Sequence, residues 1–355
     1  MSVWSIVAPQ DAGFALDIAE SLDKLVADRR AWNVHGVVVT RGGRLVIERY
    51  FKGEDRRRGH ALGEVAFDAD TLHDLRSVSK SVVGLLYGIA LARGEVPPPE
   101  AKLIPLFPRY ADLAGDSGRA QWTVHHALTM TMGTDWDELS LPYTDPSNSE
   151  IAMDGAPDRY RYVLERPVVF APGTRWVYCG GATALLARLI ADGTGRSLHA
   201  FAREVLFEPL GLGPTEWLTD GKSIEFAASG LRMRPRDLAR IGRLLLDGGA
   251  LEGTTIVSGE WLARMTTEFA VCDEVRRYGY QWYLGHFGFT AAAGPGWSRN
   301  RLEAFHGAYG NGGQRLWVVP GLDLVVAVVC GNYDTPEQWI PPTRVLREVV
   351  LPGLR

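Results

Sequence analysis

The chain has 355 residues, of which 46% are hydrophobic and 23% charged, and its formal net charge at pH 7 is -4. These fractions are typical of a folded globular protein and exclude a disordered chain, while the length predicts one large domain or two closely joined ones. The negative charge balance argues against a nucleic-acid-binding protein, which would need a basic face.

Signals for targeting, membrane insertion and disulfide formation are weak. The N-terminal segment MSVWSIVAPQDAG lacks the basic and apolar regions of a signal peptide. No apolar run approaches the roughly 18 residues of a membrane-spanning helix, so no membrane partner is expected. The three cysteines are too few and too widely separated for a disulfide framework or a zinc site. We therefore expect a cytoplasmic protein, or a periplasmic one if a leader has been removed.

The N-terminal part of the chain predicts a helix followed by a hairpin. Residues 12–30 place apolar and charged positions at helical spacing, as in a surface helix. Residues 35–51 hold two β-branched runs on either side of an R-G-G-R turn, which is a hairpin pattern. We expect the charged stretch 53–60 that follows to be a loop.

A buried helix is predicted next. Residues 77–93 are mostly apolar and rich in helix formers, and Gly94 and three prolines end the segment. The helix would therefore begin at Ser77.

Helical patterns dominate from about 100 to 265, and strand-like runs return near 278. Within the helical part, the polar stretch 133–160 predicts an irregular loop that faces the substrate. Helices are expected at 181–193, 198–207, 235–247 and 341–350, and strands at 278–285, 312–320 and 322–333.

Strands at both ends with helices between them predict a mixed α/β (α+β) protein. We expect residues 1–75 and 266–355 to form one sheet domain together. Residues 76–265 would form a mostly helical domain inserted into it.

A serine hydroxyl is a poor nucleophile until a base removes its proton, and a lysine can do so if a helix and nearby positive groups lower its pKa. In an S-x-x-K sequence at the start of a helix, the two side chains share one face. Ser77 and Lys80 have this spacing in an apolar segment, where an unused lysine would be costly. Ser21 and Lys24 have it too, but on a charged surface helix. For Ser77 and Lys80, a capping serine with a snorkelling lysine is the alternative interpretation.

Five segments together resemble the class C β-lactamases and their esterase and amidase relatives, in the family's order from about residue 11 to 350. The resemblance implies a β-lactamase/transpeptidase-like fold, with an antiparallel sheet flanked by helices and an inserted helical domain. It also implies a serine hydrolase that needs no metal or other cofactor. The segments are LRSVSKSVVGLLYGIAL, HHALTMTMGTDWDE, RPVVFAPGTRWVYCGGATALLARLI, ASGLRMRPRDLARIGRLLLDGG and YGNGGQRLWVVPGLDLVVAVVCGNY.

By this resemblance, Ser77 matches the serine that is acylated and Lys80 matches its lysine partner. Tyr178 matches the tyrosine of the family's Y-x-N element. A phenol held near an ammonium group loses its proton more easily, so tyrosine and lysine would share the role of general base.

The family's third element, K-T-G or a degenerate form, lies on the strand beside the site. Its counterpart here is Phe305-His306-Gly307, followed by Ala308. The backbone N–H groups of Ser77 and Ala308 would then form the oxyanion hole. A slip of one residue in this glycine-rich segment would shift the assignment.

Two departures from the β-lactamase pattern bear on the substrate. Gly180 stands where the family has the asparagine of Y-x-N, and the lysine of K-T-G is missing. Both groups would bind a β-lactam antibiotic, so the chain resembles most the esterase and 6-aminohexanoate-dimer-hydrolase branch, which cuts ester or linear amide bonds. Candidate substrate-binding residues are Trp136, Tyr143, His306 and Gly307.

Two alternatives stay open at this point. One is a true β-lactamase or D-amino-acid peptidase in which Arg315 or His306 replaces the missing cation. The other is a non-catalytic binding member of the fold. The expected partner is a small ester or amide rather than nucleic acid or a membrane, and the oligomeric state is not predicted. We interpret Cys179 as a packing residue and the His125-His126 pair as structural.

Overall fold

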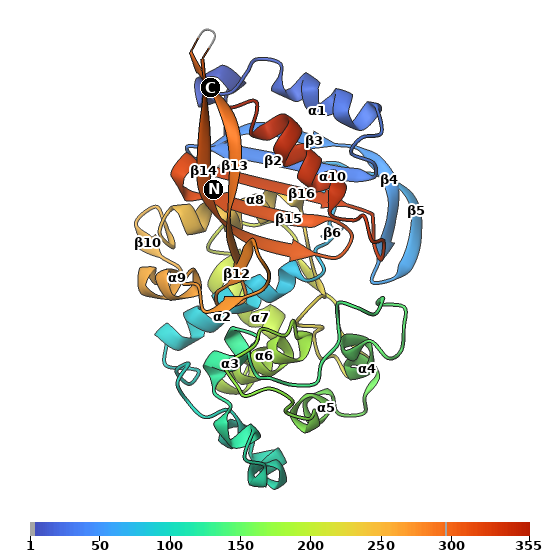
Figure 1. The fold of residues 1–355 in the computed structure, drawn as a ribbon, viewed down its shortest axis with the longest axis vertical. Coiled ribbons are helices and arrows are strands. Elements are labelled where there is room, and N and C mark those ends of the chain that lie inside the picture. The colour runs from blue at the N-terminus through green and yellow to red at the C-terminus, as the bar shows by residue number, and fades with distance from the viewer. Residues whose placement is uncertain (1–3, 295–296) are drawn as a thin grey trace.

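The computed structural model describes residues 4–294 and 297–355, and its centre is one large sheet (Figure 1). The strands are β1 (Ser5–Ile6), β2 (Val34–Arg41), β3 (Arg44–Tyr50), β11 (Ala270–Val271), β12 (Arg276–Tyr278), β13 (Tyr283–Gly294), β14 (Trp297–Gly310), β15 (Gln314–Val319) and β16 (Leu324–Cys330). Their order is β1-β3-β2-β16-β15-β14-β13-β12-β11. The pairs are antiparallel except that β1 runs parallel to β3. As predicted, the sheet is assembled from both ends of the chain.

The first hairpin is confirmed and a second one was not foreseen. β2 and β3 meet at Gly42 and Gly43, whose φ angles of 57° and 70° suit glycine in a tight turn. The expectation of a loop at 53–60 was wrong, because β4 (Lys52–Arg57) and β5 (His60–Ala66) pair there. This hairpin is mostly exposed on both faces, so its sequence lacks the apolar alternation that identifies a strand.

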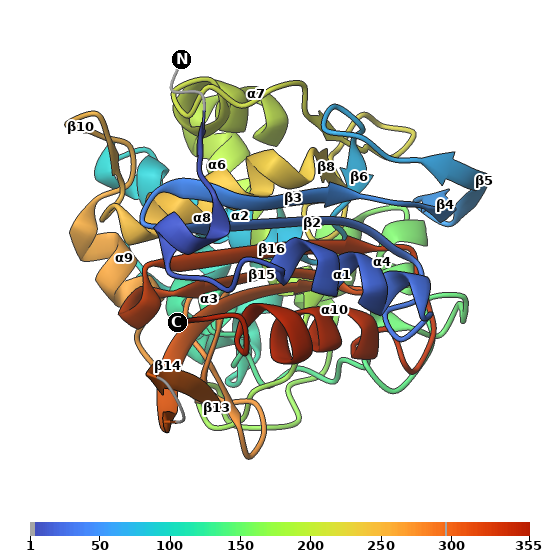
Figure 2. The same cartoon turned by 90° about the horizontal axis from the view of Figure 1, so that it is seen from above.

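Helices cover both faces of the sheet, as Figure 2 shows from above. α1 (Ile18–Ala27), α10 (Ile340–Arg344) and the helical turns at 345–350 lie on one face, while α2 (Val78–Ala92) and α8 (Pro235–Leu246) lie on the other. Val326 and Val328 of β16 pack towards α1, and Val325 and Ala327 pack towards α2 and α8. The alternation of side chains along a strand therefore explains why β16 is apolar at every position.

The remaining helices gather around α2, in the lower half of Figure 1. The helices predicted at 181–193, 198–207 and 235–247 are confirmed, while α8 packs on the sheet although it lies within 76–265. The domain boundaries at 75/76 and 265/266 therefore stay a prediction. In the described part of the chain, no helix is both long and apolar enough to cross a bilayer. The helices are α3 (Val124–Leu128), α4 (Ser149–Gly155), α5 (Arg159–Glu165), α6 (Gly180–Thr194), α7 (Leu198–Ala202) and α9 (Gly259–Met265).

The buried helix α2 is held close to its neighbours by two glycines. A Cβ atom at Gly84 would lie 2.9 Å from the carbonyl oxygen of Tyr280, and one at Gly88 would lie 2.1 Å from the ring of Trp261. The chain enters α2 from β6 (His73–Asp74), which pairs with β8 (Leu231–Met233) and, through it, with β7 (Glu216–Trp217). Packing along α2 and this short sheet before it fix where Ser77 lies.

Candidate active site

Ser77 and Lys80 are in contact at the start of α2. Ser77 is the residue that caps the helix, and Lys80 donates a hydrogen bond from Nζ to Ser77 Oγ at 2.8 Å. Lys80 is only 1% exposed. Arg76, just before the serine, has a φ of 49°, a conformation that L-residues other than glycine rarely adopt. The backbone thus turns sharply where the hydroxyl is presented.

Tyr178 joins these two residues although it lies far along the chain. It precedes α6 and is buried, and the centroid of its ring is 4.7 Å from Lys80 Nζ. Ser77 and Lys80 are both among the groups that act on the pKa of its hydroxyl. Burial raises the pKa of Tyr178, and Lys80 opposes that rise. The hydroxyl, amine and phenol predicted to act together therefore lie together.

Two buried glutamates, which the sequence analysis missed, flank Lys80. The ammonium group lies 3.2 Å from Glu138 Oε1 and 3.4 Å from Glu150 Oε2. It also donates to the carbonyl oxygen of Ala228 at 3.3 Å. A lysine buried this deeply is stable as a cation only with such partners.

Glu138 is held in place by three further donors. Its Oε2 atom accepts hydrogen bonds from Gly180 N at 2.6 Å and from Trp136 Nε1 at 2.9 Å. Its Oε1 atom accepts one from the hydroxyl of Tyr143 at 3.2 Å. These bonds orient one carboxylate oxygen towards Lys80.

The two glutamates set the charge of Lys80. Burial lowers the pKa of Lys80, but Glu138 and Glu150 outweigh burial, and the net shift is upward. The condition under which a lysine acts as the base, a pKa lowered by nearby positive groups, is therefore not met at Lys80, because its neighbours are carboxylates rather than cations. Lys80 is therefore an ammonium ion in the resting site.

The two glutamates divide one proton between them. Burial raises the pKa of Glu138 to about 8, although Lys80 acts to lower it. Burial also opposes ionisation of Glu150, but Lys80 and hydrogen bonds from Glu138 and Ser229 lower its pKa to about 2. At neutral pH the pair thus carries a single negative charge, which balances Lys80.

A cleft of about 650 Å³ opens at Ser77 and Tyr178. Aromatic and aliphatic side chains make up much of its wall, with a small number of charged groups among them, as is typical of small-molecule sites. Besides Tyr178 and His286, the aromatic residues are Tyr143, Tyr283, Phe287, Phe305, Tyr309, Trp317 and Trp339, and the charged ones are Asp273, Arg276, Arg315 and Arg347.

Of the two aromatic residues predicted to shape the substrate pocket, one lines the cleft. Tyr143 does, with its hydroxyl directed to Glu138. Trp136 lies behind the site, where a Cβ at Gly181 would meet its ring at 2.8 Å. Its contact with Glu138 gives it a part in holding the carboxylate instead.

The side chains of the third predicted element, Phe305-His306-Gly307, lie on both faces of β14. Phe305 and Tyr309 line the cleft, whereas His306 lines a separate pocket with Arg243 and Pro320. The structure therefore does not bring His306 to Ser77. Gly307 lies on the face of Tyr309, where a Cβ would come 2.8 Å from that ring.

The end of β14 approaches the nucleophile closely. Pairing between β13 and β14 ends at Gly307, so Ala308 to Gly310 extend past the partner strand. A Cβ at Gly310 would lie 2.3 Å from the carbonyl oxygen of Leu75, two residues before Ser77. Glycine at this position lets the strand come close to the segment that presents Ser77.

A candidate metal cluster lies outside this cleft. Among the described residues, three side chains bring possible metal-ligand atoms within 4.8 Å of one another. They are His35, Asp55 and His73. None of them lines the cleft at Ser77.

Comparison with known proteins identifies the family. The family model described as Beta-lactamase matches residues 22–349. The chain belongs to the β-lactamase family. The predicted resemblance is thereby confirmed.

Relatives within the β-lactamase family are named hydrolases. The 6-aminohexanoate-dimer hydrolase of Paenarthrobacter ureafaciens is 27% identical over 318 residues, which cover 84% of this chain and 73% of that protein. Esterase EstB of Burkholderia gladioli is 28% identical over 211 residues, or 57% of this chain and 51% of that protein. The prediction of a hydrolase is confirmed at this level.

The β-lactamase-type fold is confirmed by solved structures. A Bacillus anthracis protein, provisionally assigned as a 6-aminohexanoate-dimer hydrolase, superposes with a TM-score of 0.73 at 19% identity. The match covers 98% of this chain and 86% of that one.

The missing asparagine of the β-lactamase pattern has a structural counterpart. A Cβ at Gly180 would lie 2.9 Å from Glu150 Oε2 and 3.0 Å from Glu138 Oε2. The two carboxyl groups thus occupy the space into which an asparagine at this position would extend. An asparagine side chain at position 180 would therefore collide with the two glutamates.

We predict that the shared proton makes stability depend on pH. Glu138 in the folded chain binds its proton up to about pH 8, whereas an unfolded glutamate releases it near pH 4.3. The unfolded state therefore holds fewer protons over this window, and the free energy of unfolding falls as pH rises. Relative to Glu138→Gln, the wild type should lose roughly 1 kcal/mol per pH unit between pH 5 and pH 8.

Urea unfolding at several pH values measures this difference. Glu64→Gln, at an exposed glutamate of β5, is the matched control and should parallel the wild type. A constant difference between the wild type and Glu138→Gln across the window would contradict a raised pKa at Glu138.

Proposed function

We propose that this protein is a serine hydrolase that cleaves ester or linear amide bonds through an acyl-enzyme at Ser77. The observation that carries the proposal is the contact of Ser77 Oγ with Lys80 Nζ at 2.8 Å, with the ring of Tyr178 beside that ammonium group, its centroid 4.7 Å from Nζ. An activated hydroxyl at the wall of an apolar cleft is the arrangement that nucleophilic catalysis requires.

Proton transfer follows from the charges. Attack by Ser77 needs a base, and Lys80 is held as an ammonium ion by Glu138 and Glu150. Burial keeps most of Tyr178 as the neutral phenol. The ammonium stabilises the minor phenolate form, and this form accepts the serine proton as the bond between Oγ and the carbonyl carbon forms. Tyr178 then donates this proton to the leaving alcohol or amine. Water then attacks the resulting ester, giving its proton to Tyr178, and Tyr178 returns this proton to Ser77 Oγ as the acid is released.

Oxyanion stabilisation is assigned to backbone groups. The N–H of Ser77 and an N–H from the end of β14, Ala308 by family alignment, would bind the oxygen of the tetrahedral intermediate. The close approach of Gly310 to Leu75 supports this placement. Removal of one such donor typically costs about 3 kcal/mol of transition-state stabilisation.

The substrate class follows from what surrounds this machinery. Gly180 lacks the amide that would bind a β-lactam side chain, and the two glutamates fill its space. Relatives named as an esterase and as a 6-aminohexanoate-dimer hydrolase support the ester and linear amide classes. Two missing polar anchors, each worth about 1.5–3 kcal/mol, should disfavour cephalosporins by roughly 10²- to 10⁴-fold.

A substrate panel tests the proposal. We expect kcat/KM for p-nitrophenyl butyrate or for the linear 6-aminohexanoate dimer to exceed that for a chromogenic cephalosporin by at least about 100-fold. Comparable values for the cephalosporin would favour a true β-lactamase. Inactivity on the whole panel by a folded protein would favour a non-catalytic role.

One observation supports substrates that carry a carboxylate, as a D-amino-acid peptidase or β-lactamase would require. Arg315 lines the cleft, and its guanidinium lies 4.8 Å over the ring of Tyr309. It donates to the carbonyl oxygens of Gly310 and Gln314, and no acidic side chain within 4–294 and 297–355 pairs with it. This cation is therefore available to an anionic group of the substrate.

The variant Arg315→Met tests whether this cation binds a substrate carboxylate. It is assayed on two esters that differ only in a terminal carboxylate. The variant should raise KM for the carboxylated ester by roughly 10- to 100-fold, the value of one charged hydrogen bond. KM for the neutral ester should stay within about twofold. Equal effects on both esters would assign Arg315 to the support of Tyr309 alone.

A further inference from the structure

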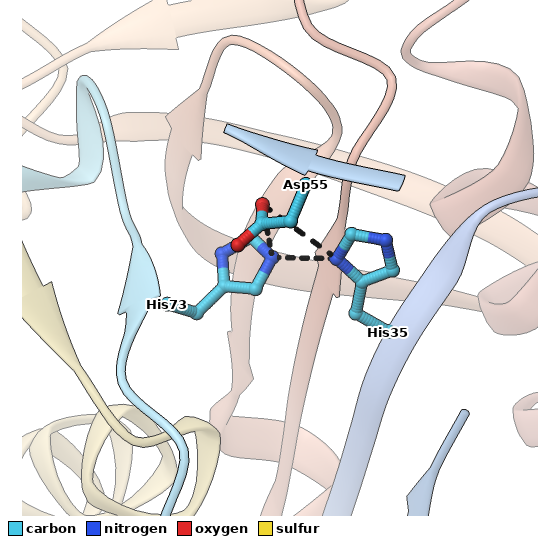
Figure 3. Close-up of side chains that lie close together, drawn as sticks. All are labelled: His35, Asp55 and His73. Carbon is cyan, nitrogen blue, oxygen red and sulfur yellow. Dashed lines mark hydrogen bonds and ion pairs between the residues drawn. The ribbon is translucent and has the colours of Figure 1, made fainter. Parts of the chain in front are cut away.

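A second cluster of polar side chains is buried away from the catalytic cleft. His35 lies on β2, Asp55 on β4 and His73 on β6, and these residues are 0%, 3% and 0% exposed. Figure 3 shows the three side chains converging. His35 Nδ1 lies 2.9 Å from His73 Nε2, and Asp55 Oδ1 lies 4.0 Å and 3.9 Å from these two nitrogens.

In each ring, the nitrogen that points away from the other histidine must carry a hydrogen. His35 Nε2 faces Asn33 Oδ1 at 3.0 Å. The amide nitrogen of Asn33 donates to the carbonyl oxygen of Glu54, which fixes Oδ1 as the acceptor. His73 Nδ1 faces the carbonyl oxygen of Asp74 at 3.0 Å, and a carbonyl can only accept.

When the rings are neutral, the two nitrogens that face each other, His35 Nδ1 and His73 Nε2, therefore carry lone pairs and no hydrogen. Two lone pairs at 2.9 Å repel one another, and the carboxylate of Asp55 adds a third electron-rich group. Such a set is stable only with a cation between its members, either a proton or a metal ion.

We propose that His35, His73 and Asp55 bind a divalent transition-metal ion, with Zn²⁺ as the best match. Two imidazoles and one carboxylate form a known zinc donor set. Bond lengths of about 2.0–2.1 Å in a tetrahedral site put ligand atoms about 3.3 Å apart. The separations of 2.9, 3.9 and 4.0 Å reach this value with shifts of a few tenths of an ångström per side chain.

The surroundings resemble the outer shell of metal sites. Each histidine donates its other N–H to an oxygen, which is the usual way such ligands are oriented. The hydroxyl of Tyr333 donates to Asp55 Oδ1 at 3.0 Å. Phe67 stacks on His35 with ring centroids 4.1 Å apart, so the ring is held in position.

Two glycines permit this arrangement. A Cβ at Gly53 would come 2.6 Å from His35 Nε2, and one at Gly331 would come 2.4 Å from His35 Cε1. The backbone therefore closes tightly around the histidine.

The position of the site indicates a structural role. The ion would tie the exposed β4–β5 hairpin and strand β6 to the central sheet. His73 lies four residues before Ser77, so the bound metal would also fix the segment that presents the nucleophile. No metal was expected from the sequence, because these ligands are dispersed along the chain and have no recognisable zinc spacing.

Metal analysis of the purified full-length chain, prepared without a histidine tag and dialysed against EDTA, tests the proposal. We expect about one zinc per chain in the wild type and at least tenfold less in His73→Asn and Asp55→Asn. His125→Asn, which removes a half-buried histidine elsewhere, is the matched control and should keep its zinc. Zinc content in the wild type that equals the content in His73→Asn would overturn the proposal.

A second measurement uses the wild type alone and so tests the proposal even if the variants fail to fold. Wild type is unfolded in guanidinium with EDTA, desalted and refolded with Zn²⁺, with Co²⁺ or without metal. Zn²⁺ should raise the midpoint of thermal unfolding by several degrees, and Co²⁺ should give the visible absorption of a tetrahedral cobalt site. Identical midpoints with and without Zn²⁺, together with a colourless cobalt sample, would show that a proton rather than a metal ion lies between the two imidazoles. The proposal would then be wrong.

Discussion

Replacing Ser77 with alanine is expected to lower kcat for ester hydrolysis by at least 10³- to 10⁴-fold, because no other hydroxyl lies in contact with Lys80 Nζ and Tyr178 in the described chain. Residual activity would come from substrate binding and the backbone N–H donors. The free energy of unfolding should change by less than about 1 kcal/mol, since Ser77 makes no side-chain cap bond to α2.

Steady-state kinetics with a p-nitrophenyl ester measures this effect. Ser21→Ala, in the other S-x-x-K sequence, is the matched control and should keep kcat within about twofold, because Ser21 lies on the surface helix α1. A Ser77→Ala enzyme that keeps more than a tenth of wild-type kcat would show that another group attacks the substrate.

Replacing Lys80 with methionine should abolish activity and also destabilise the fold. The variant leaves Glu138 and Glu150 buried beside one another without their cation. Breaking a buried ion pair by removing one partner costs roughly 3–5 kcal/mol, part of which is recovered when the carboxyls take up protons. We expect kcat to fall by about 10³-fold or more.

Urea unfolding and ester kinetics check both parts of this expectation. Lys24→Met, at a lysine that is 77% exposed and forms an ion pair with Asp28, should change neither quantity measurably. The triple variant Lys80→Met, Glu138→Gln, Glu150→Gln should recover stability without recovering activity. Full stability of the single variant would contradict the buried ion cluster.

Local patterns in the sequence were enough to predict much of the fold. The apolar segment at 77–93, the R-G-G-R turn and the apolar strand at 322–333 correspond to α2, the β2–β3 hairpin and β16. Each is decided by residues near in sequence, through helix formers, turn glycines or a run buried on both sides. The β4–β5 hairpin was missed because both of its faces are mostly exposed.

The candidate site was predicted only in part. Ser77, Lys80 and Tyr178 were proposed from the sequence because S-x-x-K and the segment around Tyr178 match a family pattern, and the structure places the three side chains together. Glu138 and Glu150 lie in a polar stretch whose many carboxylates look alike until the fold brings two of them to Lys80.

His306 illustrates a different limit. Successive residues of a strand point to opposite faces, so an assignment made by alignment alone places a side chain in or out of the cleft according to a single residue of register. Phe305 and Tyr309 line the cleft, while His306 lies on the opposite face of β14.

The most direct test of the catalytic assignment is intact-protein mass spectrometry after reaction with a fluorophosphonate, followed by peptide mapping. We expect one adduct per chain, on Ser77, in the wild type, and none in Ser77→Ala. Tyr178→Phe should be labelled far more slowly, because the proton acceptor is lost. An adduct on a different residue, or unlabelled Ser77 in a folded wild-type protein, would contradict the assignment.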